Sequence, residues 1–373
     1  MPNATGDIGT TAGSKRRWRE NLPGLDFERE AELLGKPIVP IVDVHTHVHG
    51  RSAATIYKRA MDLFGIERFY TQSRLDQVDD VRAVMGDRVR FIAFPEWRFE
   101  NTEPVFREEY LDIIRGWHAV GARMAKLWGA PRVWEFAGGD PSDCAALDAP
   151  WRVKHAELAA ELGMMFMAHI ADPDTWFEAK WNDPAKFGGT KRDQYRGLEV
   201  MVERFDVPWV VAHMGGWPED LDFLDGLLDR HDNLYLDTSA TKWIVRELSK
   251  HPAERVVKFF EQWRGRVLFG SDIVTLEDHL VPGDPEHPRG QQASNEAEAF
   301  DLYASRYWAQ RAMLETGWRG PSPIADADLA MIDPERFSED DSPTLRGLAL
   351  SDELLAEMYA GAVRVVDDWY DQH

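Results

Sequence analysis

The chain has 373 residues, of which 44% are hydrophobic and 29% charged. This composition excludes disordered, collagen-like and low-complexity proteins, and the length suits one large α/β barrel or two ordinary domains. Lys plus Arg number 43 against 65 Asp plus Glu, which gives a net charge of −22. Such a surface repels phosphate, so we expect a small-molecule substrate and neither nucleic acid nor membrane as a partner.

Cysteine use and the N-terminal residues indicate a cytoplasmic protein. Cys144 is the single cysteine, which excludes an internal disulfide and a zinc–thiolate cluster and fits a reducing compartment. The sequence KRRW at 15–18 is reminiscent of a twin-arginine export signal, but polar residues follow it, so we reject export. No run of about 18 apolar residues occurs, so we expect no membrane span.

Residues 1–36 are polar, apart from a short predicted helix at 26–34, and we interpret them as an N-terminal arm. From residue 37 onward, short β-branched or aromatic runs alternate with helical patterns, as in sequential βα units. Eight parallel strands in one continuous run favour a closed (β/α)₈ TIM barrel over an open doubly wound sheet. The predicted strands are 38–45, 66–72, 89–94, 122–128, 164–169, 209–213, 234–237 and 267–270.

The helical patterns between and after these strands complete one domain, at 37–373. A long Pro- and acid-rich connection at 275–290 follows the eighth strand, residues 317–344 look irregular, and Ser351 is a typical N-cap for a final amphipathic helix at 351–370. We therefore predict a C-terminal helical extension to the barrel. The predicted helices are 104–120, 150–162, 192–205, 219–230, 252–263, 293–316 and 351–370.

Polar residues occupy the C-terminal ends of four predicted strands, where the active site of such a barrel lies. Strand one ends in DVHTH at 43–47, and side-chain alternation puts His45 and His47 on the same side. Strands five, six and eight end in His169, His213 and Asp272. Imidazoles and a carboxylate that converge from separate strands predict a divalent cation site with an open position for water. We expect Zn²⁺, with Mn²⁺ or Fe²⁺ as alternatives.

Four ordered motifs resemble the amidohydrolase superfamily: DVHTH at 43–47, AHIADP at 168–173, VAHMG at 211–215 and LFGSD at 268–272. More narrowly, they resemble its amidohydrolase-related branch, which contains aminocarboxymuconate-semialdehyde decarboxylase, resorcylate decarboxylases and lactonases. The resemblance runs from about residue 37 to the C-terminal helix, where 348–366 is similar to the closing helix of that branch. It implies a metal-dependent enzyme and a homodimer.

The resemblance also implies roles for individual residues. His45, His47, His169 and Asp272 match metal ligands, and Asp272 also matches the residue that acts as a base. His213 matches either a ligand of a second metal or a residue that faces the substrate and handles protons, and the sequence leaves these two roles open.

Lys126, at the end of predicted strand four, bears on the number of metals. Some members of the superfamily carry a carboxylated lysine there, which bridges two metal ions. The alternative is an unmodified lysine that pairs with a carboxylate or anchors an acidic substrate. We favour the unmodified lysine, because the related branch is mostly mononuclear.

Other side chains after the strands are candidates for support or substrate contact. Asp43 could hold a ligand imidazole or nearby backbone, and we expect a supporting role. Arg98 and Arg132 could clamp a substrate carboxylate, and Trp128 could form an aromatic wall. Surface exposure of the two arginines and ordinary packing of the tryptophan are the alternatives.

These residues predict a metal-dependent hydrolase that activates water to cleave a C–N or C–O bond of an amide, lactone or ester. We expect Asp272 to accept the proton of that water, and His213 to help stabilise the developing oxyanion. The alternative is a non-oxidative decarboxylase of a small aromatic or unsaturated acid. A catalytically inactive barrel is a third hypothesis, disfavoured because none of the five site positions has lost its ligand-type residue.

Overall fold

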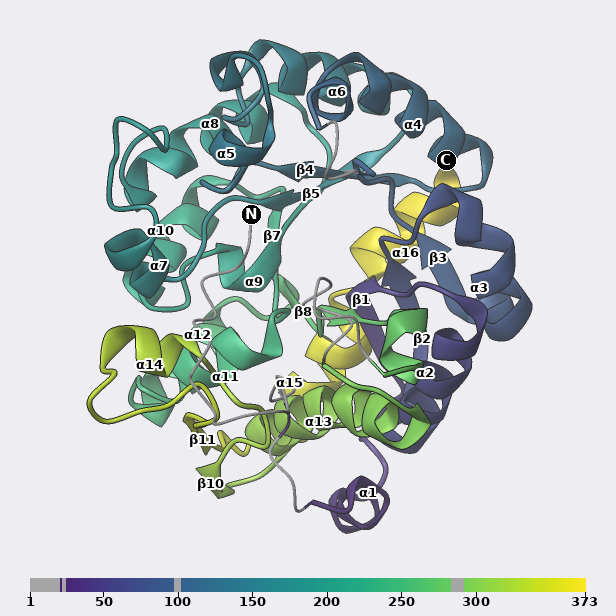
Figure 1. Cartoon of the computed structure of the whole chain (residues 1–373), viewed down its shortest axis with the longest axis vertical. Coiled ribbons are helices and arrows are strands. Elements are labelled where there is room, and N and C mark those ends of the chain that lie inside the picture. Colours follow the sequence, from purple (N-terminus) through teal and green to yellow (C-terminus); the bar gives the residue numbers. More distant parts are fainter. Residues whose placement is uncertain (1–20, 22–24, 97–101, 283–291) are drawn as a thin grey trace, which may run out of the picture.

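The computed structural model describes residues 21, 25–96, 102–282 and 292–373. These residues form a (β/α)₈ barrel, with parallel strands at the centre and helices around them (Figure 1). The strands are β1 (Ile41–His47), β2 (Ile66–Thr71), β3 (Val89–Phe91), β4 (Met124–Trp128), β5 (Met165–His169), β6 (Trp209–Val211), β7 (Leu234–Asp237), β8 (Val267–Leu268) and β9 (Ile273–Val274).

Backbone hydrogen bonds join these strands into a closed ring. One run of parallel pairs contains β3, β2, β1 and β9, and a second runs from β4 to β8 in chain order. Ala93, just after β3, donates to Met124 O (2.8 Å) and accepts from Lys126 N (2.6 Å), which joins the two runs. On the other side, Val44 N of β1 donates to Phe269 O at 2.9 Å. The predicted closed barrel is therefore confirmed.

The eighth strand is interrupted at the site end of the barrel. Its first piece, β8, pairs with β7, and its second piece, β9, pairs with β1. The residues between the two pieces are Gly270, Ser271 and Asp272. This break turns Asp272 out of the strand, at φ 60°.

The outer helices follow the strands in chain order, and most of them surround the barrel in Figure 1. They are α2 (Arg51–Phe64), α3 (Val78–Met85), α4 (Glu108–Ala119), α5 (Val133–Phe136), α6 (Pro150–Glu161), α7 (Asp174–Ala179), α8 (Lys191–Arg204), α9 (Ala212–Gly215), α10 (Leu221–Arg230), α11 (Thr241–Leu248) and α12 (Ala253–Gln262). Helix α13 (Glu296–Glu315) packs against α1 (Phe27–Leu34) and α2.

The C-terminal extension covers the end of the barrel opposite the predicted site. Val363 and Val366 pack with Val42, Met124 and other inward-facing strand residues in one buried apolar cluster. Arg68 of β2 forms a two-point ion pair with Asp367 (2.8 and 2.6 Å). The extension comprises α15 (Asp352–Ala356), a π-helical turn (Glu357–Gly361) and α16 (Arg364–Gln372).

Several predicted boundaries differ from the structure. The first strand begins at Ile41 rather than at residue 38, and the sixth ends at Val211 rather than at 213. The final helix is not continuous over 351–370, since the π-helical turn divides it. The segment predicted as irregular contains α14 (Asp328–Ile332) and β10 (Arg319–Pro321), which pairs with β11 (Thr344–Arg346). Much of the predicted arm lies outside the described residues.

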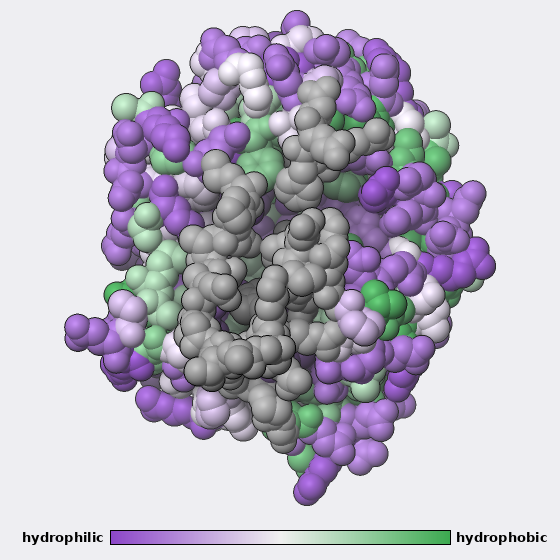
Figure 2. Space-filling view, viewed as in Figure 1, coloured by the Kyte–Doolittle hydropathy of each residue, from purple (hydrophilic) through white to green (hydrophobic). Residues whose placement is uncertain are grey.

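Within the described ranges, we find no helix whose length and apolar character would let it span a bilayer. Figure 2 shows that the described part of one face is mostly hydrophilic, with apolar residues in small separate patches. This surface fits the large excess of acidic residues.

Candidate metal centre

Three of the four predicted ligands lie together at the C-terminal end of the barrel. Asp272 Oδ1 is 3.1 Å from His47 Nε2 and 3.6 Å from His45 Nε2, and the three donor atoms lie within 4.8 Å of one another. A tetrahedral cation with bonds of about 2.0–2.1 Å needs donors about 3.3 Å apart. The measured separations lie on either side of that value, so the donor set fits a divalent cation.

Strand geometry explains why these side chains meet. His45 and His47 are alternate residues of β1 and therefore point to the same side of the strand. Asp272 donates its backbone N–H to His45 O at 2.8 Å, which fixes the interrupted strand beside β1. The ring centroids of the two histidines are 5.6 Å apart.

Asp43 ties together the two segments that carry the ligands. Its carboxylate accepts from His45 N (3.1 Å), Ser271 N (3.1 Å), Ser271 Oγ (2.6 Å) and Tyr307 OH (2.9 Å). Burial raises the pKa of Asp43 to about 7, against the lowering effect of these hydrogen bonds. Asp43 thus contacts the backbone on either side of the site, in line with the supporting role expected of it.

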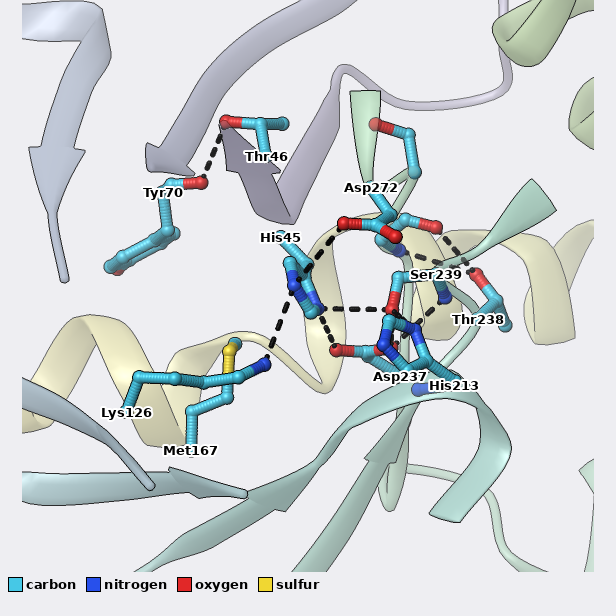
Figure 3. Close-up of polar contacts among 12 residues, drawn as sticks. His45, Thr46, Tyr70, Lys126, Met167, His213, Asp237, Thr238, Ser239 and Asp272 are labelled. Atoms are coloured by element: carbon cyan, nitrogen blue, oxygen red, sulfur yellow. Dashed lines mark hydrogen bonds and ion pairs between the residues drawn. The ribbon is translucent and has the colours of Figure 1, made fainter. Parts of the chain in front are cut away.

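Asp237 and Ser239, which the sequence analysis missed, form the buried base of the site (Figure 3). Asp237 Oδ2 is 2.9 Å from His45 Nδ1, and Ser239 Oγ is 3.0 Å from His45 Nδ1 and 2.7 Å from His213 Nδ1. The signal was present, because Asp237 ends the seventh strand just as the predicted ligands end theirs.

His45, His213 and Asp237 form a second group of potential metal donors. Its closest separation, 2.9 Å, is that of a hydrogen bond, and the Ser239 hydroxyl contacts the Nδ1 atoms of both imidazoles. We therefore interpret this second group as a hydrogen-bonded network that supports the first.

His213 lies beside this network in an uncommon backbone conformation, at φ 60°. Its N–H donates to Asp237 Oδ1 at 2.9 Å, which turns the chain out of the strand predicted to end there. Burial, followed by the nearby His169, holds the pKa of His213 well below its usual range. The imidazole is therefore neutral near pH 7, with its ring stacked at 5.1 Å from that of His45.

His169, the fourth predicted ligand, lies at the end of β5 beside His213, with ring centroids 4.6 Å apart. Its Nε2 is 3.3 Å from Asp172 Oδ1, and Asp172 in turn accepts from Trp181 Nε1 at 3.1 Å. Neither of the two donor groups found among the described residues includes His169. Its role as a ligand therefore stays a prediction.

Lys126 points from β4 into the site, and its side chain is 4% exposed. Its Nζ is 3.5 Å from His45 Nε2. Burial lowers the pKa of Lys126 to about 8, while Asp237 and Asp272 raise it. The lysine is thus close enough to meet a substrate bound at the predicted ligands.

The two site carboxylates are ionised. Burial alone would raise the pKa of both Asp237 and Asp272, but neighbouring histidines outweigh it: mainly His45 at Asp237, and His47 with His45 at Asp272. Both pKa values therefore lie well below the usual range. The site combines a neutral imidazole with ionised carboxylates, which is a set able to bind a cation and accept protons.

Two of the three residues predicted to contact substrate lie within the described part of the chain. Trp128 ends β4 with its ring 6.2 Å from that of His169, and it also faces Phe136 at 6.2 Å. The guanidinium of Arg132 lies over Phe136, 4.8 Å from the ring centroid. Trp128 thus lies next to His169, and Arg132 lies next to Phe136, whereas Arg98 lies outside the described residues.

No protein-family model matches the chain, and no curated protein matches it. Structural neighbours include a probable 2-pyrone-4,6-dicarboxylic acid hydrolase from Acinetobacter baumannii (12% identity, 71% of this chain and 92% of that chain, TM-score 0.39). Another is a dihydroxybenzoic acid decarboxylase from Polaromonas sp. JS666 with bound manganese (13%, 71% and 97%, TM-score 0.41). A third is the IDCase of Metarhizium anisopliae (16%, 88% and 97%, TM-score 0.43).

All three neighbours share less than 25% identity with this chain and have TM-scores below 0.5. At these identities and TM-scores, the substrates and metals of the neighbours do not transfer to this chain.

Proposed function

We propose that this protein is a metal-dependent hydrolase that cleaves a C–N or C–O bond in a small organic amide, lactone or ester. The observation that supports it most is the convergence of His45, His47 and Asp272 at separations that suit a divalent cation. His169 is proposed as a further ligand. Zn²⁺ is the proposed ion, with Mn²⁺ or Fe²⁺ as alternatives that the same donors can bind.

When bound, such a cation supplies Lewis-acid chemistry, which polarises the substrate and makes water acidic enough to react near neutral pH. The chain itself moves the protons. The ionised carboxylate of Asp272 is proposed to accept the proton of the water and to pass it to the leaving group, and the neutral imidazole of His213 is proposed to assist this transfer. Trp128 and Arg132 are proposed to contact the substrate, and Lys126 is proposed to remain unmodified.

The proposal is tested with metal-loaded protein and panels of lactones, esters and amides in ¹⁸O-labelled water. We expect ¹⁸O in the product, and a loss of turnover of about 10²–10⁴-fold in Asp272→Asn. His118→Asn, in helix α4 on the outside of the barrel, is the matched control and should retain full activity. Protein that binds no divalent cation, or turnover that resists chelation, would contradict the proposal.

Decarboxylation is the second candidate, because Lys126 places a buried cation within 3.5 Å of His45 Nε2. A lysine there could pair with a substrate carboxylate next to the metal ligands. Carboxylated aromatic and unsaturated acids in the same assay separate the two reactions. Release of CO₂ without ¹⁸O in the product would identify the decarboxylase.

A further inference from the structure

The hydrogen bonds beneath the candidate metal centre determine where the protons of two histidines lie. Asp237 is fully buried, and four donors surround its carboxylate. Oδ2 faces His45 Nδ1 at 2.9 Å, while Oδ1 accepts from the N–H groups of His213 and Ser239, each at 2.9 Å. The Ser239 hydroxyl also donates to Oδ1.

A count of protons follows from these contacts. An ionised carboxylate can only accept, so His45 must carry a proton on Nδ1 to bond with Asp237. The hydroxyl of Ser239 has one proton, which it gives to the same carboxylate. The 2.7 Å contact between Ser239 Oγ and His213 Nδ1 therefore requires a proton on His213 Nδ1.

Lys126 lies on the other side of the His45 ring from Asp237. Its Nζ is 3.5 Å from His45 Nε2, whereas Asp237 contacts Nδ1. The same Nε2 atom faces Asp272 in the candidate metal centre.

Gly270 leaves the space that this network needs. A Cβ atom at this position would lie 3.2 Å from the Cβ of His45, 3.3 Å from that of Ser239 and 3.4 Å from that of Asp237. The three side chains of the network therefore pack directly over a residue without a side chain.

We propose that Asp237 and Ser239 are positioning residues that hold His45 and His213 in the Nδ1–H tautomer. The Nε2 atom of each imidazole then keeps a lone pair. The lone pair of His45 can bind the cation, and the lone pair of His213 can accept a proton or bind a cation. This inference rests on the proposed function and extends it, because it explains how both imidazoles are prepared before substrate arrives. Fixing the tautomer through the second ring nitrogen is a general way to strengthen a metal-binding histidine.

The tautomers can be measured directly by ¹⁵N NMR on metal-free protein labelled at histidine. We expect the signals of His45 and His213, assigned by substitution, to show protonated Nδ1 and bare Nε2 in the wild-type chain. Bare Nδ1 on His45 would overturn the proposal. This measurement needs neither metal nor substrate. If the wild-type protein bound no metal, the proposed function would fail, whereas the tautomers of His45 and His213 would still be tested.

Two variants and one control test the consequence for binding. Asp237→Asn should lower the affinity for Zn²⁺ by about 10- to 100-fold in a chelator competition, since an amide has one acceptor oxygen for the four donors. Ser239→Ala should change the ¹⁵N signals of His213. Asp112→Asn is the matched control, because Asp112 is exposed on α4, where its carboxylate pairs with Arg115 at 2.8 Å, and takes no part in the network. A folded Asp237→Asn protein with wild-type affinity and wild-type signals would overturn the proposal.

Discussion

Four non-glycine residues with positive φ follow barrel strands β6, β7 and β8: His213, Met214, Ala240 and Asp272. Such conformations cost of order 1–3 kcal/mol each and persist where surrounding contacts over-determine them. At His213 and Asp272 those contacts are visible, since the first donates its N–H to Asp237 and the second to His45 O. The strain is concentrated where the candidate site turns its side chains toward one another.

At the residue scale, the sequence identified the strand-end histidines and Asp272 but missed Asp237 and Ser239. Strand ends can be predicted from apolar runs followed by polar residues, which is a local signal. The partner of His45 Nδ1 lies 192 positions away, and its identity depends on how the barrel closes. His169 shows the same limit, because ring orientation is set by Asp172 and its neighbours rather than by the strand pattern.

His155 provides a prediction for the pH dependence of stability, away from the candidate metal centre. Its Nε2 donates to Arg107 O at 2.6 Å, and burial together with the nearby Arg152 lowers the pKa of His155 to about 3. As the pH falls from 7 to 5, the His155 side chain therefore takes up a proton in the unfolded chain, where its pKa is about 6.5, but stays neutral in the folded chain. This one residue should cost about 2 kcal/mol of stability at pH 5.

The variant His155→Gln keeps an N–H donor and cannot titrate. We expect its free energy of unfolding to fall about 2 kcal/mol less between pH 7 and pH 5 than that of the wild type, measured by urea denaturation at each pH. Equal decreases in the two proteins would show that His155 does not carry this dependence.

At the element scale, the interrupted eighth strand gives a second prediction. Gly270→Ala would add a Cβ atom 3.2–3.4 Å from the Cβ atoms of His45, Ser239 and Asp237. Those side chains must shift by a few tenths of an ångström, so we expect a loss of about 1–3 kcal/mol in stability and weaker metal binding. The measurements are urea denaturation and chelator competition. Gly317→Ala is the control, because a Cβ there meets nothing within 4 Å, and equal behaviour of the two variants would refute the prediction.

The C-terminal extension gives a third prediction, because α16 covers the barrel end opposite the site. Val366 is fully buried against the inward-facing strand residues, whereas Arg364 is exposed. Val366→Ala should lower the free energy of unfolding by about 2 kcal/mol, since two methyl groups and their packing are lost. Arg364→Ala should stay within about 0.5 kcal/mol of the wild type.

A measurement of metal affinity shows whether the C-terminal extension only packs against its end of the barrel or also supports the candidate site. We expect the affinity of Val366→Ala to equal that of the wild type. A large loss of affinity there would mean that the extension also orders the ligands at the other end of the strands.

Helices and strands were predictable from the sequence where a local pattern of hydrophobic residues determines the secondary structure. The apolar runs located all eight barrel strands, because strands buried on both faces are nearly continuous in hydrophobic residues. The final helix was predicted as continuous, yet it contains a π-helical turn at Glu357–Gly361. Within that turn Tyr359 reaches Glu315 of α13 with a 2.7 Å hydrogen bond, a long-range contact that no helical periodicity records.

At the scale of the whole molecule, a net charge of −22 complicates any test for a bound cation. An acidic surface attracts divalent ions without a specific site, and such attraction is screened at an ionic strength of about 0.15 M, where the Debye length is about 8 Å. An ion at the proposed centre would be held by direct coordination to His45, His47 and Asp272, which are partly shielded from solvent. Salt should therefore distinguish the two kinds of binding.

A cation that binds only the folded chain should raise its free energy of unfolding by about 2.7 kcal/mol at a concentration 100 times its Kd. We expect this gain in the wild-type protein at physiological ionic strength, measured by denaturation with and without Zn²⁺, and its loss on chelation. Asp272→Asn should lose most of the gain, because the remaining imidazoles of His45, His47 and the proposed ligand His169 then lack the anionic donor. The net charge of this variant differs from that of the wild type by only one unit. If both proteins gained the same stability, the cation would be binding the acidic surface and not the proposed centre.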